Sequence, residues 1–211
     1  MPKQLFFSLS SEKQNKIKDS ALAEFSENQF HEASINQIIK IAGISRGSFY
    51  QYFEDKEDLY FYLIKDFLES KLSEFSKSYV KGEYNNVFTV YRQIFLSMLS
   101  TISDEKYQPF FKNMFLSLNY DLEKKLREIV EKMQEAILSN TFKKAMINIG
   151  DELPYLKELL QIIRLISNDL FTRKVIENLD NKQIIEIYDM RMELLRSVRE
   201  IKQMKLMGDL K

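Results

Sequence analysis

The residues best suited to recognition chemistry lie in one short stretch, SRGSFYQY, at positions 45–52. Arg46 can donate two hydrogen bonds to guanine, Gln51 can pair with adenine, and the ring of Tyr50 can contact thymine methyl groups or phosphates. Gly47 adds no side chain, so a helix that carries it can approach a neighbouring surface closely. This combination indicates noncovalent recognition of a DNA major groove.

Residues for catalysis or metal binding are scarce. The chain has no cysteine, which excludes disulfides, cysteine-based zinc sites and cysteine nucleophiles. Its one histidine, His31, falls between two predicted helices, where we expect an exposed loop residue. The sequence contains neither a G-x-S-x-G motif nor a glycine-rich phosphate loop. We therefore expect no catalytic residues, no metal site, no cofactor and no enzymatic activity.

Three short helices are predicted to position the 45–52 stretch. The first covers LSSEKQNKIKDSALAEFSENQF, with Ser11 as its capping residue. The second covers SINQIIKIA, begins at Ser34 and ends at Gly43, which can turn the chain sharply without a side-chain clash. Ser45 can cap a third helix that ends near residue 52. Two helices separated by a glycine-containing turn are typical of a helix-turn-helix.

The segment AGISRGSFYQYFEDKEDLY resembles the motif of TetR-family transcriptional repressors. The resemblance implies an all-α fold with an N-terminal helix-turn-helix, and it implies that Phe49 and Phe53 belong to the core. It also implies that Lys56, at the start of the next helix, contacts a phosphate there. With the recognition chemistry above, the candidate DNA-contacting residues are Ser34, Ser45, Arg46, Gly47, Ser48, Tyr50, Gln51, Tyr52 and Lys56.

We call the predicted DNA-binding part of the chain, residues 1–60, the head. Its charge limits how tightly one head could bind DNA. The whole chain has 31 basic and 31 acidic residues, which argues against a protein that coats nucleic acid without specificity. Residues 1–60 contain seven basic and nine acidic residues, a net charge of −2. We therefore expect modest affinity for each head and a dependence on dimerisation. The segment FFSLSSEK either docks onto the first or the fourth predicted helix or forms an arm that reaches DNA through Lys3.

The rest of the chain predicts an all-α protein of about nine helices. Periodic apolar residues place further helices near 59–79, 84–101, 107–118, 121–148, 153–178 and 182–207. We divide the chain into a DNA-binding domain, residues 1–54, and a helical effector-binding and dimerisation domain, residues 55–211. No apolar run is long enough to span a membrane, and the start does not resemble a signal peptide, so we expect a cytoplasmic protein.

Large flexible side chains are abundant in the second predicted domain. The chain has 16 Phe, 11 Tyr and 9 Met, and at helical spacing these residues first of all indicate a packed core. Methionines and aromatics also line adaptable apolar pockets. The resemblance favours such a pocket among the middle helices. Its candidate lining residues are Phe67, Phe75, Tyr91, Phe95, Met98, Phe111, Met114, Phe115, Met133 and Ile137.

The last two predicted helices are apolar on more than one face. Such helices need a second partner, either within the monomer core or in another subunit. The resemblance favours a two-fold four-helix interface. The candidate interface residues are Leu159, Ile163, Ile166, Tyr188, Leu195 and Val198.

These observations together predict a homodimeric repressor that binds a pseudo-palindromic double-stranded operator. A small apolar or amphipathic effector is expected to shift the dimer to a form whose heads no longer match the two half-sites. Two alternatives stay open. One is an all-helical carrier or enzyme that does not bind DNA, and the other is a DNA-binding regulator controlled by a protein partner.

Overall fold

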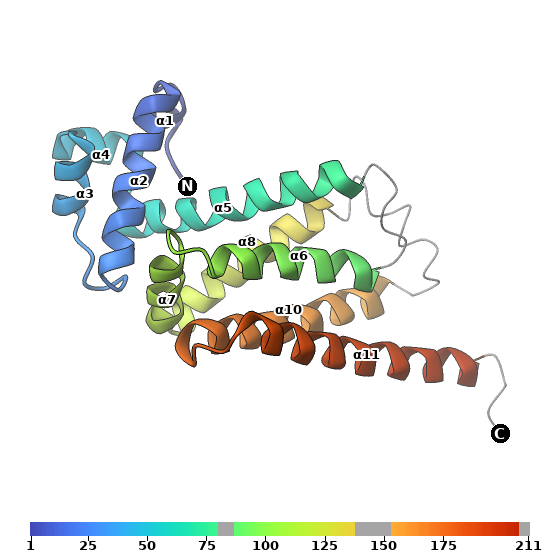
Figure 1. Cartoon of the computed structure of the whole chain (residues 1–211). Coiled ribbons are helices and arrows are strands. Elements are labelled where there is room, and N and C mark those ends of the chain that lie inside the picture. Colours follow the sequence, from blue (N-terminus) through green and yellow to red (C-terminus); the bar gives the residue numbers. More distant parts are fainter. Residues whose placement is uncertain (80–86, 138–152, 207–211) are drawn as a thin grey trace.

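The computed structural model describes residues 1–79, 87–137 and 153–206. Within these ranges all regular structure is helical, which confirms the predicted fold class (Figure 1). The ten helices are α1 (Gln4–Phe7), α2 (Ser11–Glu27), α3 (Ile35–Ala42), α4 (Arg46–Tyr52), α5 (Lys56–Tyr79), α6 (Val87–Ile102), α7 (Gln108–Ser117), α8 (Tyr120–Ile137), α10 (Leu153–Ile176) and α11 (Asn181–Leu206). The helix that the sequence did not predict is α1. Parts of the predicted helices near 84–101 and 121–148 lie outside the described residues.

Helices α1 to α4 form one end of the molecule (Figure 1). Ser10 caps α2 by accepting from the N–H of Lys13, so the cap lies one residue before the predicted Ser11. Ser34 caps α3 and Ser45 caps α4, as predicted, through bonds of 3.2 and 3.0 Å from the N–H groups of residues 36 and 48. The core beneath these helices consists of fully buried side chains: Phe6, Ile17, Ala21, Phe25, Ile38, Phe49, Phe53 and Leu59.

Gly43 ends α3 in the left-handed region, with φ of 68°. We expect Gly43→Ala to lower the free energy of unfolding by about 1–2 kcal/mol, because an L-residue is strained there. The new Cβ would lie 3.4 Å from the flexible end of Lys16, so the backbone strain dominates. Gly47→Ala is the matched control. It lies inside α4, where the new Cβ would make an ordinary van der Waals contact with the Ser45 Oγ at 3.7 Å, and it should raise stability by about 0.5–1 kcal/mol. Urea unfolding that shows equal losses for both variants would contradict this account of the turn.

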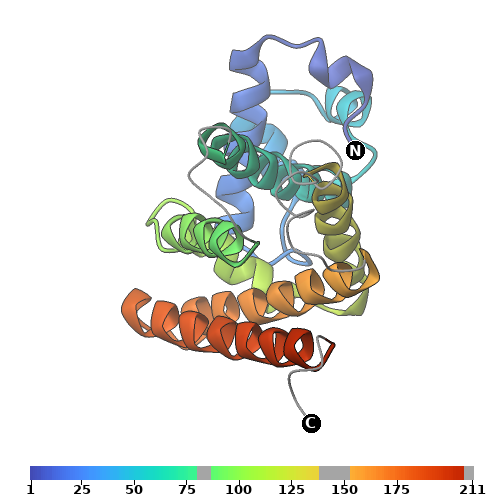
Figure 2. The ribbon, with the colours of Figure 1, turned by 90° about the vertical axis from the view of Figure 1, so that its right-hand side faces the viewer.

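Helix α5 leaves the head and runs along the larger helical body (Figure 1). Helices α10 and α11 lie side by side on the face of this body that is farthest from α1 to α4 (Figures 1 and 2). An ion pair of 2.6 Å between Asp169 and Arg191 and a ring stack of Phe95 on Tyr188, with centroids 3.8 Å apart, fix this pair and attach it to α6. None of the described helices combines the length and apolarity needed to cross a membrane.

Candidate nucleic-acid interface and ligand cavity

The exposed surface of the head centres on Arg46, in the first turn of α4. Its guanidinium donates to the Asn36 side-chain oxygen at 2.7 Å and to the Tyr50 hydroxyl at 3.2 Å. It also lies over the Tyr50 ring, 5.5 Å from the centroid. These three side chains, from two consecutive helices, form an exposed cluster of donors and acceptors, which we call the reading cluster.

The other residues predicted to contact DNA differ in how exposed they are. Residues Ser45, Gly47 and Gln51 are exposed beside the reading cluster, whereas Ser34, Ser48 and Tyr52 are partly buried. The Tyr52 ring packs against Phe6, with centroids 6.4 Å apart, so it serves the core of the head more than its surface. Sequence reasoning missed Asn36. The signal was available, because Asn36 is a polar residue in the first turn of the helix that precedes the turn.

The N-terminal segment docks onto the protein, as in the first of the two alternatives, but it contacts α4, the third predicted helix, as well as α5, the fourth. The Lys3 N–H donates to the Tyr52 carbonyl at 2.8 Å, and the Lys3 ammonium donates to the Tyr50 carbonyl at 2.9 Å. Phe6 is fully buried, with its ring centroid 5.0 Å from that of Phe53. These contacts place a positive charge at the carbonyl end of α4, where it stabilises the helix.

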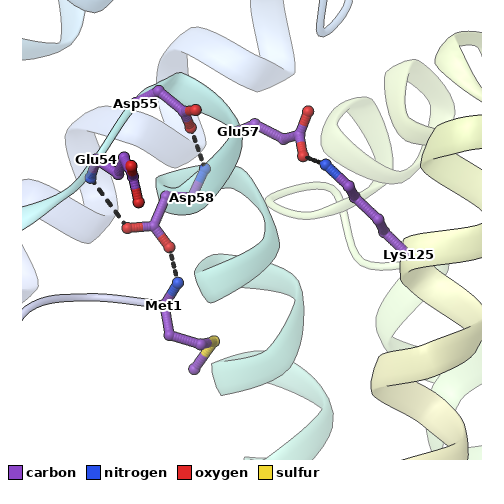
Figure 3. A network of polar contacts seen from close by, with 6 residues as sticks. All are labelled: Met1, Glu54, Asp55, Glu57, Asp58 and Lys125. Carbon is purple, nitrogen blue, oxygen red and sulfur yellow. Dashed lines mark hydrogen bonds and ion pairs between the residues drawn. The ribbon is translucent and has the colours of Figure 1, made fainter.

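The first turn of α5 fixes the chain terminus and contacts α8 (Figure 3). The Asp58 carboxylate contacts the N-terminal ammonium and accepts from the Glu54 N–H at 3.1 Å. The neighbouring Glu57 forms an ion pair with Lys125 of α8. One helical turn therefore joins the N-terminal segment, the head and the larger domain.

Lys56 is engaged inside the head. Its ammonium donates to the carbonyls of Ala33, at 2.7 Å, and His31, at 3.2 Å, and lies 4.9 Å from the Phe30 ring centroid. Burial lowers the pKa of Lys56, and the buried carboxylate of Glu24 offsets part of this effect. Lys56 thus fastens the loop between α2 and α3, and at most one of its N–H groups is left for a phosphate.

We expect Lys56→Met to lower the free energy of unfolding by about 1–3 kcal/mol, because it removes the donor from carbonyls that include the buried Ala33 oxygen. The matched control is Lys13→Met, which removes the same charge from an exposed site on α2 and should change stability by less than about 0.5 kcal/mol. Urea unfolding measures both effects. A Lys56 variant as stable as the Lys13 variant would show that the two carbonyl bonds contribute nothing.

A cavity of about 410 Å³ lies between α5, α6, α7, α8 and α10, within the size range of small-molecule sites. Its lining is mainly apolar and aromatic. Met133 is not among the lining residues, and the side chains of Phe75 and Ile137 lie outside the described residues. The other predicted pocket residues all line it: Phe67, Tyr91, Phe95, Met98, Phe111, Met114 and Phe115.

The cavity also has a charged edge that the sequence reasoning missed. Arg127 pairs with Glu123 at 2.9 Å within α8, and Arg164 of α10 lies 3.6 Å from Glu131. Arg127, Glu123 and Arg164 all line the cavity. The signal for Arg164 was its position as the one charged residue within the apolar run LLQIIRLI.

Helix α7 joins the cavity wall to the head. Met114 lines the cavity, whereas Asn113 and Ser117 contact the end of α2 and the loop after it. The Asn113 amide donates to the Ser26 carbonyl at 2.9 Å, and the Ser117 hydroxyl accepts from the Phe30 N–H at 3.0 Å. A displacement of α7 by a bound molecule would therefore be transmitted to α2.

Half of the six predicted interface residues are buried within the single chain. Leu159, Ile163 and Tyr188 are at most 4% exposed within the single chain, so they form its core and cannot form its surface. Ile166 and Leu195 are partly buried, and the Val198 side chain lies outside the described residues. Which face of these helices meets a second subunit stays a prediction, because both faces are apolar.

Exposed apolar side chains instead lie on the outside of the α10–α11 pair. We call Ile162, Met190 and Leu194 the outer face, and their side chains are 41–62% exposed. Leu165 is 55% exposed but lines the cavity, so it is not part of this face. The Asp169–Arg191 ion pair links α10 and α11, the two helices that carry the outer face.

Two family models match the chain. Residues 17–63 match "Bacterial regulatory proteins, tetR family", and residues 86–197 match "Tetracyclin repressor-like, C-terminal domain". The second match alone covers more than half of the 211 residues. The chain belongs to the TetR family. The resemblance inferred from residues 42–60 is thereby confirmed, and the first match contains the whole reading cluster.

Relatives of this TetR-family chain support the same assignment. It is 35% identical to the HTH-type transcriptional regulator AcrR of Shigella flexneri over 91 residues. This aligned region covers 43% of this chain and 42% of AcrR. The chain spans less than half the length of AcrR and of a second relative from Bacillus subtilis.

Solved structures show the same fold over nearly the whole TetR-family chain. A structure assigned to a TetR-family transcriptional regulator of Syntrophomonas wolfei has a TM-score of 0.72 and 18% identity, covering 89% of this chain and 96% of that one. FadR of Bacillus subtilis, solved in complex with stearoyl-CoA, has a TM-score of 0.64 and 20% identity. The match covers 86% of this chain and 96% of FadR.

Proposed function

We propose that this chain is a sequence-specific transcriptional repressor of the cytoplasm that binds its operator as a homodimer and catalyses no reaction. A small apolar or amphipathic effector, bound in the 410 Å³ cavity, releases it from DNA. The observation that carries the proposal is the reading cluster. Arg46, Asn36 and Tyr50 stand exposed on two helices that a left-handed Gly43 holds at a fixed angle.

The reading cluster has the chemistry that a base-reading surface needs. Arg46 can leave its partners Asn36 and Tyr50 to donate to guanine, and the freed amide and hydroxyl can then bond other base edges or phosphates. The small residues Ser45 and Gly47 beside the cluster allow close approach to the groove. The division into a DNA-binding domain, residues 1–54, and an effector-binding and dimerisation domain, residues 55–211, fits this placement, because α5 begins at Lys56.

Two heads are required for tight binding because one head can neutralise only a few DNA phosphates. The net charge of −2 over residues 1–60 and the engagement of Lys56 with backbone carbonyls both reduce the positive charge available to DNA. Two heads joined through the outer face would double the contact and impose a two-fold operator. Half-sites would then be centred about 34–36 Å apart.

The effector role rests on the cavity and its mechanical connections. FadR of Bacillus subtilis was solved with stearoyl-CoA in the same fold, which shows that this fold can hold a long amphipathic molecule. In the present chain α7 joins the cavity to α2 through Asn113 and Ser117, and α8 joins it to α5 through Lys125 and Glu57. A ligand that separates α7 and α8 would move both ends of the head, because packed helices shift between discrete arrangements.

A regulator that responds to a protein partner instead of a small molecule is the second candidate. The exposed apolar side chains Leu116 and Tyr120, 46% and 76% exposed near the turn between α7 and α8, favour it. A partner that binds there would act on the same helix, α7, as an effector in the cavity.

The proposal is tested by selecting DNA from a random duplex pool with the full chain and sequencing the bound fraction. We expect an inverted repeat whose half-site centres are separated by about one helical turn. Enrichment of no sequence would contradict DNA recognition. A single, unrepeated half-site would contradict the dimer.

A further inference from the structure

The charged edge of the cavity contains one cation that is almost completely buried. The Arg164 side chain is 10% exposed, and its Nε–H has no hydrogen-bond partner among the described residues. Buried guanidinium groups are normally fully hydrogen-bonded, so each unpaired N–H requires an explanation. Arg164 lines the cavity, and an acceptor placed there would complete its coordination.

The neighbouring carboxylates do not complete it. Glu131 lies 3.6 Å from the Arg164 Nη1, beyond ordinary hydrogen-bond distance, and is 50% exposed. Glu123 is bonded to Arg127 at 2.9 Å within α8. Burial lowers the pKa of Arg164 and Glu131 offsets part of that effect, yet a guanidinium stays protonated in proteins. The cavity therefore holds a positive charge that is desolvated and only partly neutralised.

A cationic head group has no comparable place in the cavity. The carboxylates at this edge are half-exposed to water and already paired, Glu123 with Arg127 and Asp169 with Arg191. A bound cation would have to break one of these pairs and would lie close to Arg164. An anionic head group would instead find an unsatisfied donor, the Arg164 Nε–H. The cavity therefore favours a negatively charged head group over a positively charged one.

We propose that the effector is an amphipathic anion whose carboxylate or phosphate head group binds Arg164, while its apolar tail lies among the aromatic and methionine side chains of α5, α6 and α7. This inference rests on the proposed effector role of the cavity and adds the chemical class of the ligand. Phe67, Met98 and Phe115 form part of the apolar wall that receives the tail. Ser167, one turn along α10 from Arg164, also lines the cavity, but its hydroxyl hydrogen is already donated to the Ile163 carbonyl at 2.9 Å, so Arg164 is the donor on which the head group depends.

The test compares dodecyl amphiphiles that differ only in head group: dodecanoate, dodecyl phosphate, dodecanol and dodecyltrimethylammonium. Each is titrated into the full chain by calorimetry at neutral pH, below its micellar concentration. We expect at least one anion to bind about 10- to 150-fold more tightly than dodecanol, the range for a hydrogen bond to a charged group. The two anions distinguish a carboxylate effector from a phosphate one. Dodecanol or the cation binding as tightly as both anions would overturn the proposal.

Two arginine variants locate the head group. R164M should abolish the preference for the anion and leave the affinity for dodecanol within about twofold, and R164K should retain part of the preference because it keeps a charge. R127M is the matched control, since Arg127 lines the same cavity but is 45% exposed and paired. It should keep most of the preference. An equal loss in R127M, or none in R164M, would overturn the assignment to Arg164.

These outcomes stay separate from those of the proposed function. If the random-pool selection yields a two-fold operator while dodecanol matches the anions, only the anion assignment fails. If no amphiphile binds at all, the anion assignment and the effector cavity both fail, and DNA recognition stands. If the selection yields no sequence, the proposed function fails, whereas the binding data still decide the role of Arg164.

Discussion

Met190→Asp or Leu194→Asp is expected to convert the dimer to a monomer and to lower operator affinity by about 100-fold or more. The two side chains are 57% and 62% exposed in the single chain, so replacing them leaves the subunit core intact. In a dimer joined through the outer face they would be buried, and an unpaired carboxylate there costs several kcal/mol. Loss of the second head then removes half of the DNA contacts.

Light scattering and fluorescence anisotropy with labelled operator measure the two effects. Leu5→Asp is the matched control for association, because Leu5 is 49% exposed on α1, at the opposite end of the molecule (Figure 2). That variant should remain dimeric. A stable dimer in both the Met190 and Leu194 variants would place the interface on another surface.

Arg46→Ala and Tyr50→Ala are each expected to weaken operator binding by about 5- to 150-fold and to relax the preference at one base position of each half-site. Both side chains lie on the exposed side of α4, and their removal leaves the buried Phe49 in place. Because Arg46 donates to the Tyr50 hydroxyl at 3.2 Å, the double variant should lose less than the product of the two single effects.

The control is Lys13→Ala, which removes one positive charge from an exposed site on α2. It should reduce affinity equally for all sequences, as a general charge effect does. Binding assays with the selected operator and with single-base variants separate the two behaviours. If Arg46→Ala and Lys13→Ala had the same effect on every sequence, the reading cluster would not read bases.

The local features of the head could be predicted from sequence because short-range chemistry determines them. Ser34, Gly43 and Ser45 define the ends of α3 and α4 through capping bonds and a left-handed turn, and each of these depends on only a few neighbouring residues. The cavity was also predictable in outline, since phenylalanine and methionine at helical spacing must face inward.

Features that depend on packing between distant segments could not be predicted. The sequence shows that α10 and α11 are apolar, but not that Tyr188 would stack on Phe95 and leave Leu194 outside. Likewise, the family motif implies a phosphate contact for Lys56, whereas the fold brings its ammonium to the carbonyls of His31 and Ala33. Charge and periodicity do not specify which of several partners a side chain meets.

Reciprocal titration tests most directly whether the cavity and the reading cluster belong to one switch. The dodecyl amphiphile that binds most tightly is titrated with and without saturating operator, and the operator is titrated with and without that amphiphile. We expect each to weaken the other by the same factor, about 5- to 150-fold, because coupling free energy is reciprocal. Unchanged affinities in both titrations would contradict the switch.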